Sequence, residues 1–384
     1  MSERIKPGPA SAVAGSDDAE LARLRAVIDA EDDAILERLN RRAQQVLEVG
    51  RLKARRGLPV YDRSRESAIV ERLTAANTGP FPDAALPAVF REVISATRSL
   101  EAPLSVAYLG PEATFCHQAS RERFGGSASF VPVRSIPDVF GAVERGAADL
   151  GVVPVENTTE GVVTQALDAL AESELVAGGE IVLRISHHLL SRSGRREDVQ
   201  RVASHPQPLA QCREWLDREL PGVPRIETAS TTAAASLAQE DPGVAAIASS
   251  LATETYGLET VEACIEDRRD NTTRFLVIGR ELPEPSDRDL TCAVFTVRKD
   301  ESGALYRLLE PFARHGVNLT AIHCRPMKGK PWEYLFFVDM EGHRDDAAVR
   351  AALTDAAEYA FSHRVLGSFA RAPGRGRAAE EGGR

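Results

Sequence analysis

The stretch LARLRAVIDAEDDAILERLNRRAQQVLEVGRLKARRGLPVYDRSRE (residues 21–66) decides the fold of the N-terminal part of the chain. Its apolar residues recur at spacings of three, four and seven, the period of one face of an α-helix. They are Leu21, Leu24, Ile28, Ile35, Leu39, Val46 and Val49. Because no proline occurs between Glu20 and Leu58, we expect one long helix that ends at GLPV, residues 57–60.

Two further helices are expected to complete this all-α domain. One follows Asp62, which stands where an N-cap residue would, and the next runs through VFREVISATRSL (89–100) after the break at GPFPD (79–83). We assign the helical domain to residues 17–102. Residues 1–16 before it have the composition of a disordered lead-in.

Three basic residues of the first helix favour a dimer. Arg42 and Lys53 are eleven positions apart, so they share a face and lie about 16 Å apart. Arg25 lies seventeen positions before Arg42, about 25 Å away and on a different face. One helix cannot bring all three to one small ligand, whereas two antiparallel copies can. Three helices also bury little core, so we predict an intertwined homodimer and leave a tetramer open.

Polar residues of the second and third helices fall on shared faces. Asp62, Arg65 and Glu66 occupy positions i, i+3 and i+4, while Thr97 and Glu101 are one turn apart. Each residue alone is typical of a solvated surface. As a set they converge on one inward side, which favours a polar ligand site.

Residues 21–101 resemble the all-helical chorismate mutase family through LR (24–25), ERLNRR (37–42), VGRLK (49–53) and YDRSRE (61–66), which all keep register. The resemblance implies a pericyclic rearrangement of chorismate to prephenate. That reaction needs a folded dianion and placed charge rather than an acid, a base or a cofactor. The implied binding residues are Arg25 of a partner subunit, Arg42, Lys53, Asp62, Arg65, Glu66, Thr97 and Glu101.

The resemblance also implies roles for these residues. Arg25 and Arg42 clamp carboxylates, Lys53 donates to a carboxylate and to the ether oxygen, and Arg65 supports the site. Asp62 and Glu66 hold the substrate hydroxyl.

Two positions depart from the best-known bacterial pattern of that family. Thr97 stands where serine is familiar, and Glu101 stands where glutamine is familiar. A glutamine donates to the ether oxygen at any pH, whereas a glutamic acid donates only when protonated. With Lys53 and Glu101 as its catalytic residues, the mutase is therefore expected to be favoured at acid pH and to lose activity as Glu101 ionises.

From Leu104 the pattern changes to short apolar runs that alternate with helices. The runs are SVAYLG (105–110), DLGVVPV (149–155), EIVLRISHHLL (180–190), VQRVASHP (199–206), GVAAIAS (243–249) and TRFLVIG (273–279). This alternation predicts an α/β domain with helices covering its sheets, here residues 104–281. ELPEPSDRD (281–289) is the expected linker at its end.

Polar segments interrupt these runs at places where strand ends commonly line a ligand crevice. They are VENTTEG (155–161), SHPQP (204–208) and DNTTRF (270–275). TASTTAAA (228–235) leads into a helix whose free N–H groups suit an anion. Taken alone, TASTTAAA also fits an ordinary N-cap, and the threonines of DNTTRF also fit plain strand hydroxyls.

Residues 106–280 resemble the prephenate dehydratase family through VAYLGPEATF (106–115), VVPVENTTEG (152–161), SHPQPLAQC (204–212), ASTTAAA (229–235) and NTTRFLVIG (271–279). The resemblance implies a two-lobed fold like that of type II periplasmic binding proteins, with prephenate between the lobes. It implies conversion of prephenate to phenylpyruvate with loss of carbon dioxide and water. Thr273 is the implied catalytic hydroxyl, acting on the departing hydroxide as a donor or relay.

The same resemblance implies a set of residues that contact prephenate. The set is Glu156, Asn157, Thr158, Ser204, His205, Gln207, Ser230, Thr231, Asn271, Thr272, Thr273 and Arg274. Among them, Arg274 is expected to bind carboxylates and Glu156 to orient the polar network.

The last part of the chain, residues 290–371, follows a third pattern. TCAVFTV, GALYRLLEPFARHG, VNLTAIHCR, WEYLFFVDM, DDAAVRAALTDAAEY and RVLGSF are expected as strand, helix, strand, strand, helix and strand. The order βαββαβ predicts a ferredoxin-like α+β unit. Residues 372–384 have the composition of a disordered tail.

GALYRLLEPF (303–312) and HCRP (323–326) resemble the ACT family of amino-acid-binding domains. The resemblance implies phenylalanine feedback at a subunit interface. The implied effector residues are Gly303, Ala304, Leu305, His323, Cys324, Arg325 and Pro326. Two positions of HCRP differ from the familiar ESRP segment, which leaves the effector open, and a dimerisation module that senses nothing is the alternative.

Composition bounds the remaining possibilities. A net charge of −10 argues against a nucleic-acid protein. No apolar run reaches the roughly 18 residues of a membrane span, and the N-terminus has no signal-peptide core. The five cysteines form no CxxC pair, and His187, His188 and His205 match no zinc spacing, so we expect a cytoplasmic protein with no metal and no cofactor.

Together the three resemblances predict an enzyme with two activities and a regulatory domain. Two alternatives remain at this point. One is a dehydratase that prefers arogenate, the amino analogue of prephenate. The other is a sensory protein that binds a ligand without turnover, because the two-lobed fold and the ACT domain both occur in proteins that only bind.

Overall fold

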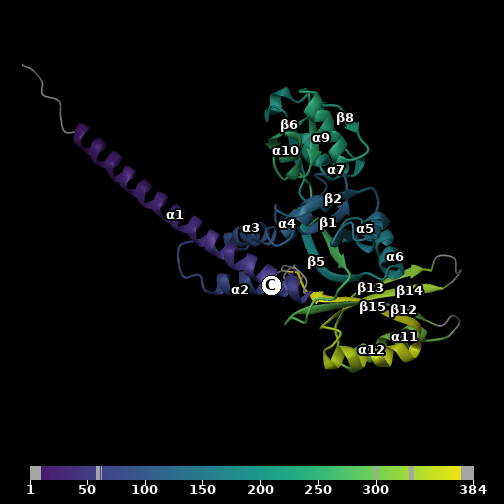
Figure 1. Ribbon diagram of the computed structural model, residues 1–384. Coiled ribbons are helices and arrows are strands. Elements are labelled where there is room, and N and C mark those ends of the chain that lie inside the picture. The colour runs from purple at the N-terminus through teal and green to yellow at the C-terminus, as the bar shows by residue number, and fades with distance from the viewer. Residues whose placement is uncertain (1–9, 58–60, 62, 298–300, 328–332, 373–384) are drawn as a thin grey trace, which may run out of the picture.

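The computed structural model describes residues 10–57, 61, 63–297, 301–327 and 333–372, and these form a helical body, a two-lobed body and a C-terminal α+β body (Figure 1). The helical body consists of α1 (Ala10–Arg56), α2 (Arg63–Ala75), a 3₁₀ turn at Asp83–Ala85 and α3 (Leu86–Arg98). Helix α1 begins seven residues before the expected start at Asp17, so the second half of the expected lead-in is helical. Asp62 lies outside the described residues.

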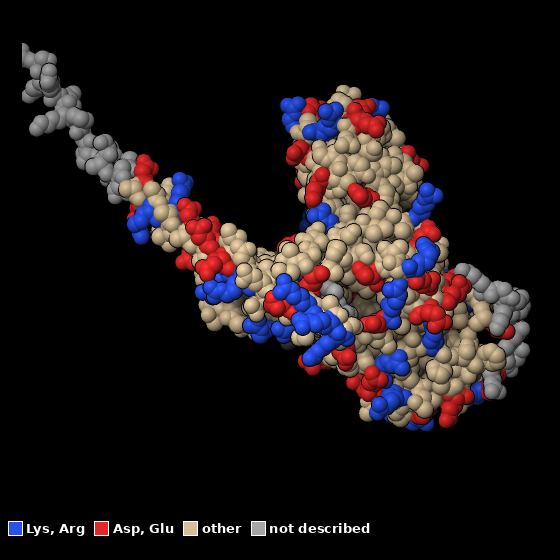
Figure 2. All heavy atoms as spheres, in the orientation of Figure 1, with Lys and Arg blue, Asp and Glu red and all other residues tan. Residues whose placement is uncertain are grey.

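Helix α1 has 47 residues and is therefore about 70 Å long. Its C-terminal part lies beside α2 and α3, while its N-terminal part projects away from the rest of the chain (Figure 1). Acidic and basic side chains are interspersed along it (Figure 2). Several of its apolar side chains are exposed, namely Leu21, Leu24, Val27, Ile28, Ile35 and Leu36.

The helical body has a very small core of its own. Among its described residues, Ile94 is the only buried apolar side chain. A single copy leaves an apolar stripe of α1 exposed to water. Burying such surface would stabilise the protein by about 25 cal/mol for each square ångström. The expected thin bundle is confirmed.

The first lobe of the two-lobed body is a mixed sheet in the order β5-β11-β3-β1-β2. Its strands are β1 (Ser105–Leu109), β2 (Ser129–Val133), β3 (Leu150–Asn157), the short β4 (Gly161–Val162), β5 (Val176–Arg184) and β11 (Thr272–Gly279). Its helices are α4 (Phe115–Phe124), α5 (Ile136–Glu144) and α6 (Thr164–Glu172). Strand β11 runs antiparallel between β3 and β5, which brings the DNTTRF and VENTTEG segments together.

The second lobe is a five-stranded sheet in the order β10-β6-β9-β7-β8. Its strands are β6 (His188–Ser191), β7 (Arg201–Ser204), β8 (Arg225–Glu227), β9 (Val244–Ala248) and β10 (Glu259–Glu262). A 3₁₀ turn (Arg196–Asp198) and α7 (Pro206–Gln211), α8 (Arg213–Glu219), α9 (Thr231–Glu240) and α10 (Leu251–Tyr256) complete it. The expected run 180–190 is split between β5 and β6, because the chain crosses from one lobe to the other there. The expected two-lobed fold is confirmed (Figure 1).

The C-terminal body has the expected βαββαβ order. Its elements are β12 (Asp289–Val297), α11 (Ala304–Arg314), β13 (Leu319–Pro326), β14 (Tyr334–Glu341), α12 (Ala347–Tyr359) and β15 (Ala360–Ala370). The strand order β13-β14-β12-β15 is that of a ferredoxin-like sheet. One face of this sheet carries α11 and α12, and the other packs on the first lobe in a shared core with Leu276 and Leu170.

The two sheets also join edge to edge, because β15 pairs with β5 at Gly367 and Ala177. A Cβ at Gly367 would overlap the Ala177 carbonyl oxygen, so no side chain fits there. Glycine is therefore required where the C-terminal sheet continues the sheet of the first lobe.

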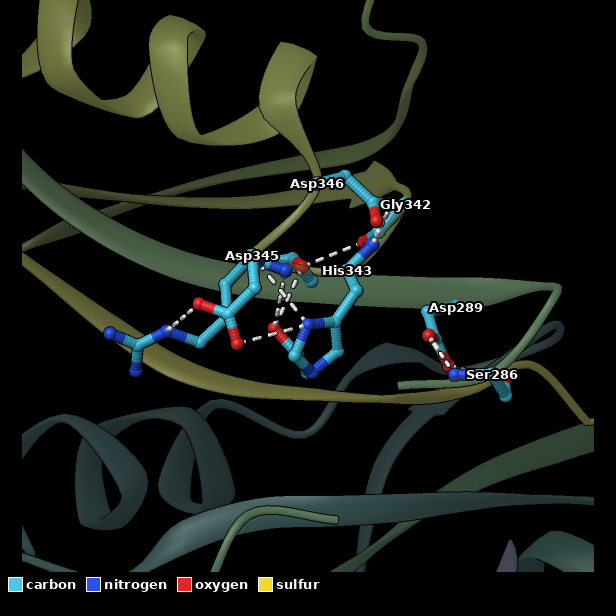
Figure 3. A network of polar contacts seen from close by, with 9 residues as sticks. Ser286, Asp289, Gly342, His343, Asp345 and Asp346 are labelled. Carbon is cyan, nitrogen blue, oxygen red and sulfur yellow. Dashed lines mark hydrogen bonds and ion pairs between the residues drawn. The ribbon is translucent and has the colours of Figure 1, made fainter. Parts of the chain in front are cut away.

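A hydrogen-bonded network secures the start of the C-terminal body (Figure 3). The Asp289 carboxylate accepts from the amide and the hydroxyl of Ser286, both at 2.6 Å, and the Asp289 carbonyl accepts from Gly342 N at 2.8 Å. At the turn before α12, Asp346 accepts from the buried His343 amide at 2.8 Å. These bonds satisfy backbone groups where the linker enters the sheet.

No helix in the described part of the chain is long and apolar enough to cross a membrane. Across the same residues, no group of three or more His, Cys, Asp or Glu side chains is arranged to hold a metal ion. All five cysteines are free.

Candidate active sites

The polar cluster of the helical body is centred on Arg42 and Thr97. The Arg42 guanidinium donates to Thr97 Oγ1, which in turn donates to Val93 O at 2.7 Å. Burial lowers the pKa of Arg42, while the negative charge of Glu66 opposes that shift. Three helices therefore bring Arg42, Glu66 and Thr97 together, as the sequence predicts.

Glu101 follows α3 and packs against α1. A Cβ added at Gly50 would lie 2.8 Å from Glu101 Cγ, which shows how closely this side chain approaches the helix. Glu101 Oε2 is buried, and within the described ranges it has no hydrogen-bond partner. Lys53 is half-buried one turn after Gly50, on the same face of α1. A buried oxygen of this kind calls for a polar partner, which a bound ligand can supply.

Arg25 lies apart from this cluster in a single copy. It is exposed in the N-terminal half of α1, seventeen positions before Arg42. Arg65 is exposed on α2, and Asp62 cannot be placed because it is outside the described residues. One copy therefore assembles a site that lacks one of its two expected carboxylate clamps.

The polar centre of the two-lobed body is Asn157 at the end of β3. Its side-chain amide donates to Thr273 Oγ1 and to Asn271 Oδ1, both at 2.8 Å. The register of β3 and β11 explains this contact, because Asn157 and Thr273 are paired across the two strands. Asn271 is 5% exposed and Thr273 is 9% exposed, so both lie in a nearly dry environment.

The orientation of the Asn157 amide follows from its neighbours. Asn157 Oδ1 accepts from the backbone N–H groups of Thr159 and Glu160, both at 2.9 Å. A backbone N–H can only donate, so the oxygen must face the loop and the nitrogen must face Thr273. Thr273 Oγ1 is then an acceptor toward Asn157, and its own hydrogen remains available to donate elsewhere.

Thr158 joins the two polar segments of the first lobe. Its hydroxyl accepts from Thr272 N at 2.9 Å and donates to Asp270 O at 3.2 Å. This position differs from the expectation that Thr158 contacts the substrate, because its hydroxyl bonds are already made within the chain.

The residues expected from the second lobe lie at the starts of α7 and α9. His205 and Ser230 are the N-cap residues of these helices, Gln207 lies in the first turn of α7, and Thr231 begins α9. Ser230 Oγ accepts from Ala233 N at 3.0 Å. The backbone N–H groups of the first turn of α9 point out of the helix and suit a carboxylate.

Ser204 differs from the expectation. It is fully buried, and its hydroxyl donates to Ile247 O on β9 at 2.7 Å. A serine hydroxyl has one hydrogen, so when it donates to a carbonyl it cannot also donate to a substrate carboxylate. Ser204 therefore holds β7 to β9 in this structure.

Arg274 and Glu156 also differ from the expectation. Successive side chains of a strand point to opposite faces of a sheet, so Thr273 and Arg274 cannot face the same cleft. The Arg274 guanidinium is buried and contacts Glu180 Oε2 at 2.9 Å and Asp339 Oδ2 at 2.5 Å. Glu156 is paired with Arg274 across the strands and shares its face. Glu156 and Arg274 both lie at the boundary with the C-terminal body. Thr272 also precedes Thr273 directly on β11, so its side chain points to the face opposite that of Thr273.

Two residues that sequence reasoning missed extend the Asn157 network toward the hinge between the lobes. Gln211 Oε1 lies 3.5 Å from Asn271 Nδ2 and 2.7 Å from His187 Nε2. Burial lowers the pKa of His187, so its ring is neutral at neutral pH. Gln211 belongs to the SHPQPLAQC segment, which marks it in the sequence, whereas the sequence presents His187 only in a histidine spacing that matches no zinc site.

The expected effector residues fall into two groups. Gly303 is the N-cap of α11 with φ +76°, a left-handed conformation that favours glycine, and Leu305 beside it is 40% exposed. In the HCRP segment of β13, Arg325 forms an ion pair with Asp168 of α6 at 3.2 Å. Cys324 and Pro326 alternate with it and are exposed.

A small cavity of about 20 Å³ lies where the C-terminal sheet meets the first lobe. Glu156, Arg274, His323 and Asp339 line it together with apolar side chains. This volume holds about one water molecule and excludes an amino acid. His323 therefore faces the domain boundary rather than a ligand-sized pocket.

Sequence-family models match the three bodies separately. The model for type II chorismate mutase matches residues 24–102, the model for prephenate dehydratase matches residues 106–283, and the ACT domain model matches residues 293–358. The fold and the two polar clusters therefore define a multidomain enzyme with two active sites and a regulatory domain.

A curated protein of Aquifex aeolicus named bifunctional chorismate mutase/prephenate dehydratase is 48% identical over 357 residues, covering 92% of this chain and 98% of that protein. One of Neisseria gonorrhoeae with the same name is 44% identical, covering 90% of this chain and 95% of that protein. The chain belongs to the family of bifunctional chorismate mutase/prephenate dehydratases.

Two solved structures are similar to a large part of the chain. A prephenate dehydratase from Arthrobacter aurescens in complex with L-Phe is 35% identical with a TM-score of 0.64, covering 73% of this chain and 96% of that chain. A protein described as GqqA, a novel type of quorum quenching acylase, is 30% identical with a TM-score of 0.65, covering 71% of this chain and 99% of that chain.

Proposed function

We propose that the helical body rearranges chorismate to prephenate and that the two-lobed body converts prephenate to phenylpyruvate, carbon dioxide and water. The observation that carries the second activity is the fixed amide of Asn157, which leaves the Thr273 hydroxyl hydrogen free for a ligand. Family membership over nearly the whole chain supports both activities together.

The dehydratase reaction places one main demand on the protein. Prephenate becomes aromatic when its ring carboxylate leaves as carbon dioxide and its ring hydroxyl leaves with a proton, so the driving force lies in the substrate. The enzyme assists the departing oxygen with a hydrogen bond and desolvates the carboxylate. Thr273 is the proposed donor, with Asn157 and Asn271 fixing its position. The α9 N-terminus is the proposed seat of a carboxylate.

The mutase reaction requires a preorganised polar cage. Arg42 and Lys53 are proposed to bind the substrate anion, Glu66 to accept from its hydroxyl, and Glu101 to face the ether oxygen. The second carboxylate clamp, Arg25, is proposed to come from a partner subunit, because one copy leaves it exposed far along α1. The exposed apolar side chains of α1 support the same homodimer.

A coupled assay tests both activities at once. Chorismate given to the purified full chain is expected to yield phenylpyruvate, which requires the mutase and the dehydratase in sequence. Parallel assays with prephenate and arogenate measure the substrate preference. Binding of prephenate without product would support a sensory protein instead, and hydrolysis of an acyl amide would support the activity for which the GqqA structure is described.

Replacement of Glu101 by glutamine is expected to raise mutase kcat/KM. A glutamine side chain always offers an N–H donor to the ether oxygen, whereas an ionised carboxylate can only accept. The expected gain is on the order of tenfold, for one recovered hydrogen bond. Mutase rates of the two proteins, measured side by side on chorismate, check this. Equal kcat/KM values would rule the idea out.

Phenylalanine is proposed as an effector at the C-terminal body, through Gly303, Ala304 and Leu305. The L-Phe complex of the Arthrobacter aurescens protein supports this proposal. Millimolar L-phenylalanine is expected to raise the melting temperature, because a ligand at 100 times its Kd stabilises the folded state by about 2.7 kcal/mol. Scanning calorimetry with D-phenylalanine as the control measures the effect. An unchanged melting temperature would favour a dimerisation module that senses nothing.

The proposed site of action is the cytoplasm. Five free cysteines, three of them buried, suit a reducing compartment better than an oxidising one. Localisation of a tagged chain in cells tests this.

A further inference from the structure

One face of α3 docks the helical body onto the first lobe. The Glu92 carboxylate accepts from Gly126 N at 3.0 Å, and Ser95 Oγ accepts from Ser127 N at 3.3 Å. Positions 92, 95 and 98 recur every three residues and therefore share that face. Arg98 is therefore the third residue, after Glu92 and Ser95, on the face of α3 that contacts the first lobe.

Arg98 contacts both bodies with the same guanidinium. Its Nη2 donates to Phe124 O, at the end of α4, at 2.9 Å. Its Nη1 contacts Glu66 Oε1 on α2 at 2.6 Å, and the two side chains are 7% and 18% exposed. A buried charged hydrogen bond of this length is stronger than a neutral one and strongly directional.

An aromatic pair holds the guanidinium from a third side. Arg98 lies over the ring of Tyr61, 5.4 Å from its centroid. Tyr61 in turn packs edge-on against Phe124 with ring centroids 5.6 Å apart. Arg98 therefore has little freedom to move relative to the first lobe.

The consequence concerns Glu66, which is proposed to accept from the substrate hydroxyl. The bond from Arg98 engages Oε1 and restrains the Glu66 carboxylate, and the substrate hydroxyl is proposed to donate to Oε2. Arg42 reaches the same region from α1, since the negative charge of Glu66 acts on it. A binding group held in this way loses less freedom when the substrate arrives.

We infer that Arg98 is a positioning residue of the mutase site, and that it holds Glu66 from an anchor on the dehydratase domain. The first active site is thus partly built by the second domain. This inference rests on the proposed mutase function.

The test uses Arg98→Met and Arg98→Lys in the full chain. Arg98→Met is expected to lower mutase kcat/KM by about ten- to a hundredfold, the usual range for losing one charged hydrogen bond. Dehydratase kcat/KM on prephenate, measured on the same sample, should be unchanged and shows that the chain is folded. Arg98→Lys should recover part of the loss, because lysine can reach Glu66 but has no second nitrogen for Phe124.

A double-mutant cycle with Glu66→Gln separates positioning from a structural role. If Arg98 acts through Glu66, the losses of the two single variants will not add in the double variant. Glu92→Gln is the matched control, since it weakens the same docking surface without touching Glu66, and it should leave the mutase nearly intact.

Three results would overturn the inference. The first is that the losses of mutase kcat/KM in Arg98→Met and Glu66→Gln add in the double variant. The second is that Glu92→Gln lowers mutase kcat/KM as much as Arg98→Met does. The third is that Arg98→Met retains full mutase activity. Absence of mutase turnover in the unmodified chain would refute the proposed function instead, so the two failures are distinguishable.

Discussion

Replacement of Thr273 by alanine is expected to remove dehydratase turnover and to leave the mutase nearly intact. The Asn157 amide donates to Thr273 Oγ1, so the threonine hydrogen is the one that can reach the departing hydroxyl. Loss of a donor that acts in the transition state typically costs about a hundred- to a thousandfold in kcat. Prephenate and chorismate consumption, measured on the same preparation, give the two rates independently.

Two further variants sharpen this prediction. Thr273→Ser keeps the hydroxyl and should retain most of the activity, whereas Thr273→Val keeps the shape and should behave like alanine. Asn157→Asp presents an acceptor where a donor now stands, which should turn the Thr273 hydrogen inward and lower kcat. Equal loss of both activities in Thr273→Ala would contradict separate sites, and full dehydratase activity in Thr273→Val would exclude Thr273 as the donor.

Replacement of Arg274 by methionine is expected to destabilise the chain rather than to weaken substrate binding alone. Burial by itself would lower the pKa of Arg274, but the carboxylates of Asp339 and Glu180 outweigh it and raise the pKa, so the guanidinium stays charged. Its removal leaves two buried carboxylates without their cation. Breaking a buried pair in this way costs about 3–5 kcal/mol of unfolding free energy.

Calorimetry of the full chain measures this effect as a lowered melting temperature. Arg213→Met is the control, because the side chains of Arg213 and its partner Asp217 are 74% and 60% exposed, and an exposed ion pair contributes about 0–1 kcal/mol. Adding Glu180→Gln and Asp339→Asn to Arg274→Met should restore much of the lost stability, since no buried charge is then left unpaired. If Arg274→Met had an unchanged melting temperature and a raised KM for prephenate, Arg274 would instead be a substrate-binding residue.

Much of the fold could be predicted from the sequence because its periodicities are strong. The three-four-seven spacing of residues 21–49 is helical, and the βαββαβ order after Leu290 follows from alternating apolar runs and helices. The boundaries of two elements differ from the prediction. Helix α1 begins at Ala10, because residues 10–16 carry no helix-breaking proline, and the run 180–190 divides where the chain passes between lobes.

The candidate sites were predicted by segment more accurately than by side chain. VENTTEG and DNTTRF do meet, because β11 inserts between β3 and β5. Within DNTTRF, however, strand alternation sends Thr273 to one face and Arg274 to the other. A sequence motif does not show which face of a sheet each of its side chains occupies, so the sequence alone does not separate Glu156 and Arg274 from the substrate residues.

Arg98 shows why other residues were missed. Its partners Glu66 and Phe124 lie 32 and 26 positions away, so no spacing rule connects them to it. In the sequence of α3, nothing distinguishes Arg98 from other charged residues, although it directly follows Thr97. The packing of α3 against α2 and against the end of α4 buries Arg98 and gives it both partners.

The sequence by itself determined the three bodies, their secondary structure and the chemical class of each site, because these depend on local periodicity and on residue types within short segments. The tertiary structure decided which side chains face a ligand, which face a domain boundary, and how the bodies are joined through Arg98, Arg274 and Gly367. The physical reason is that burial, pairing and the face of a strand are properties of contacts between segments far apart in the chain, and periodicity within one segment does not contain them.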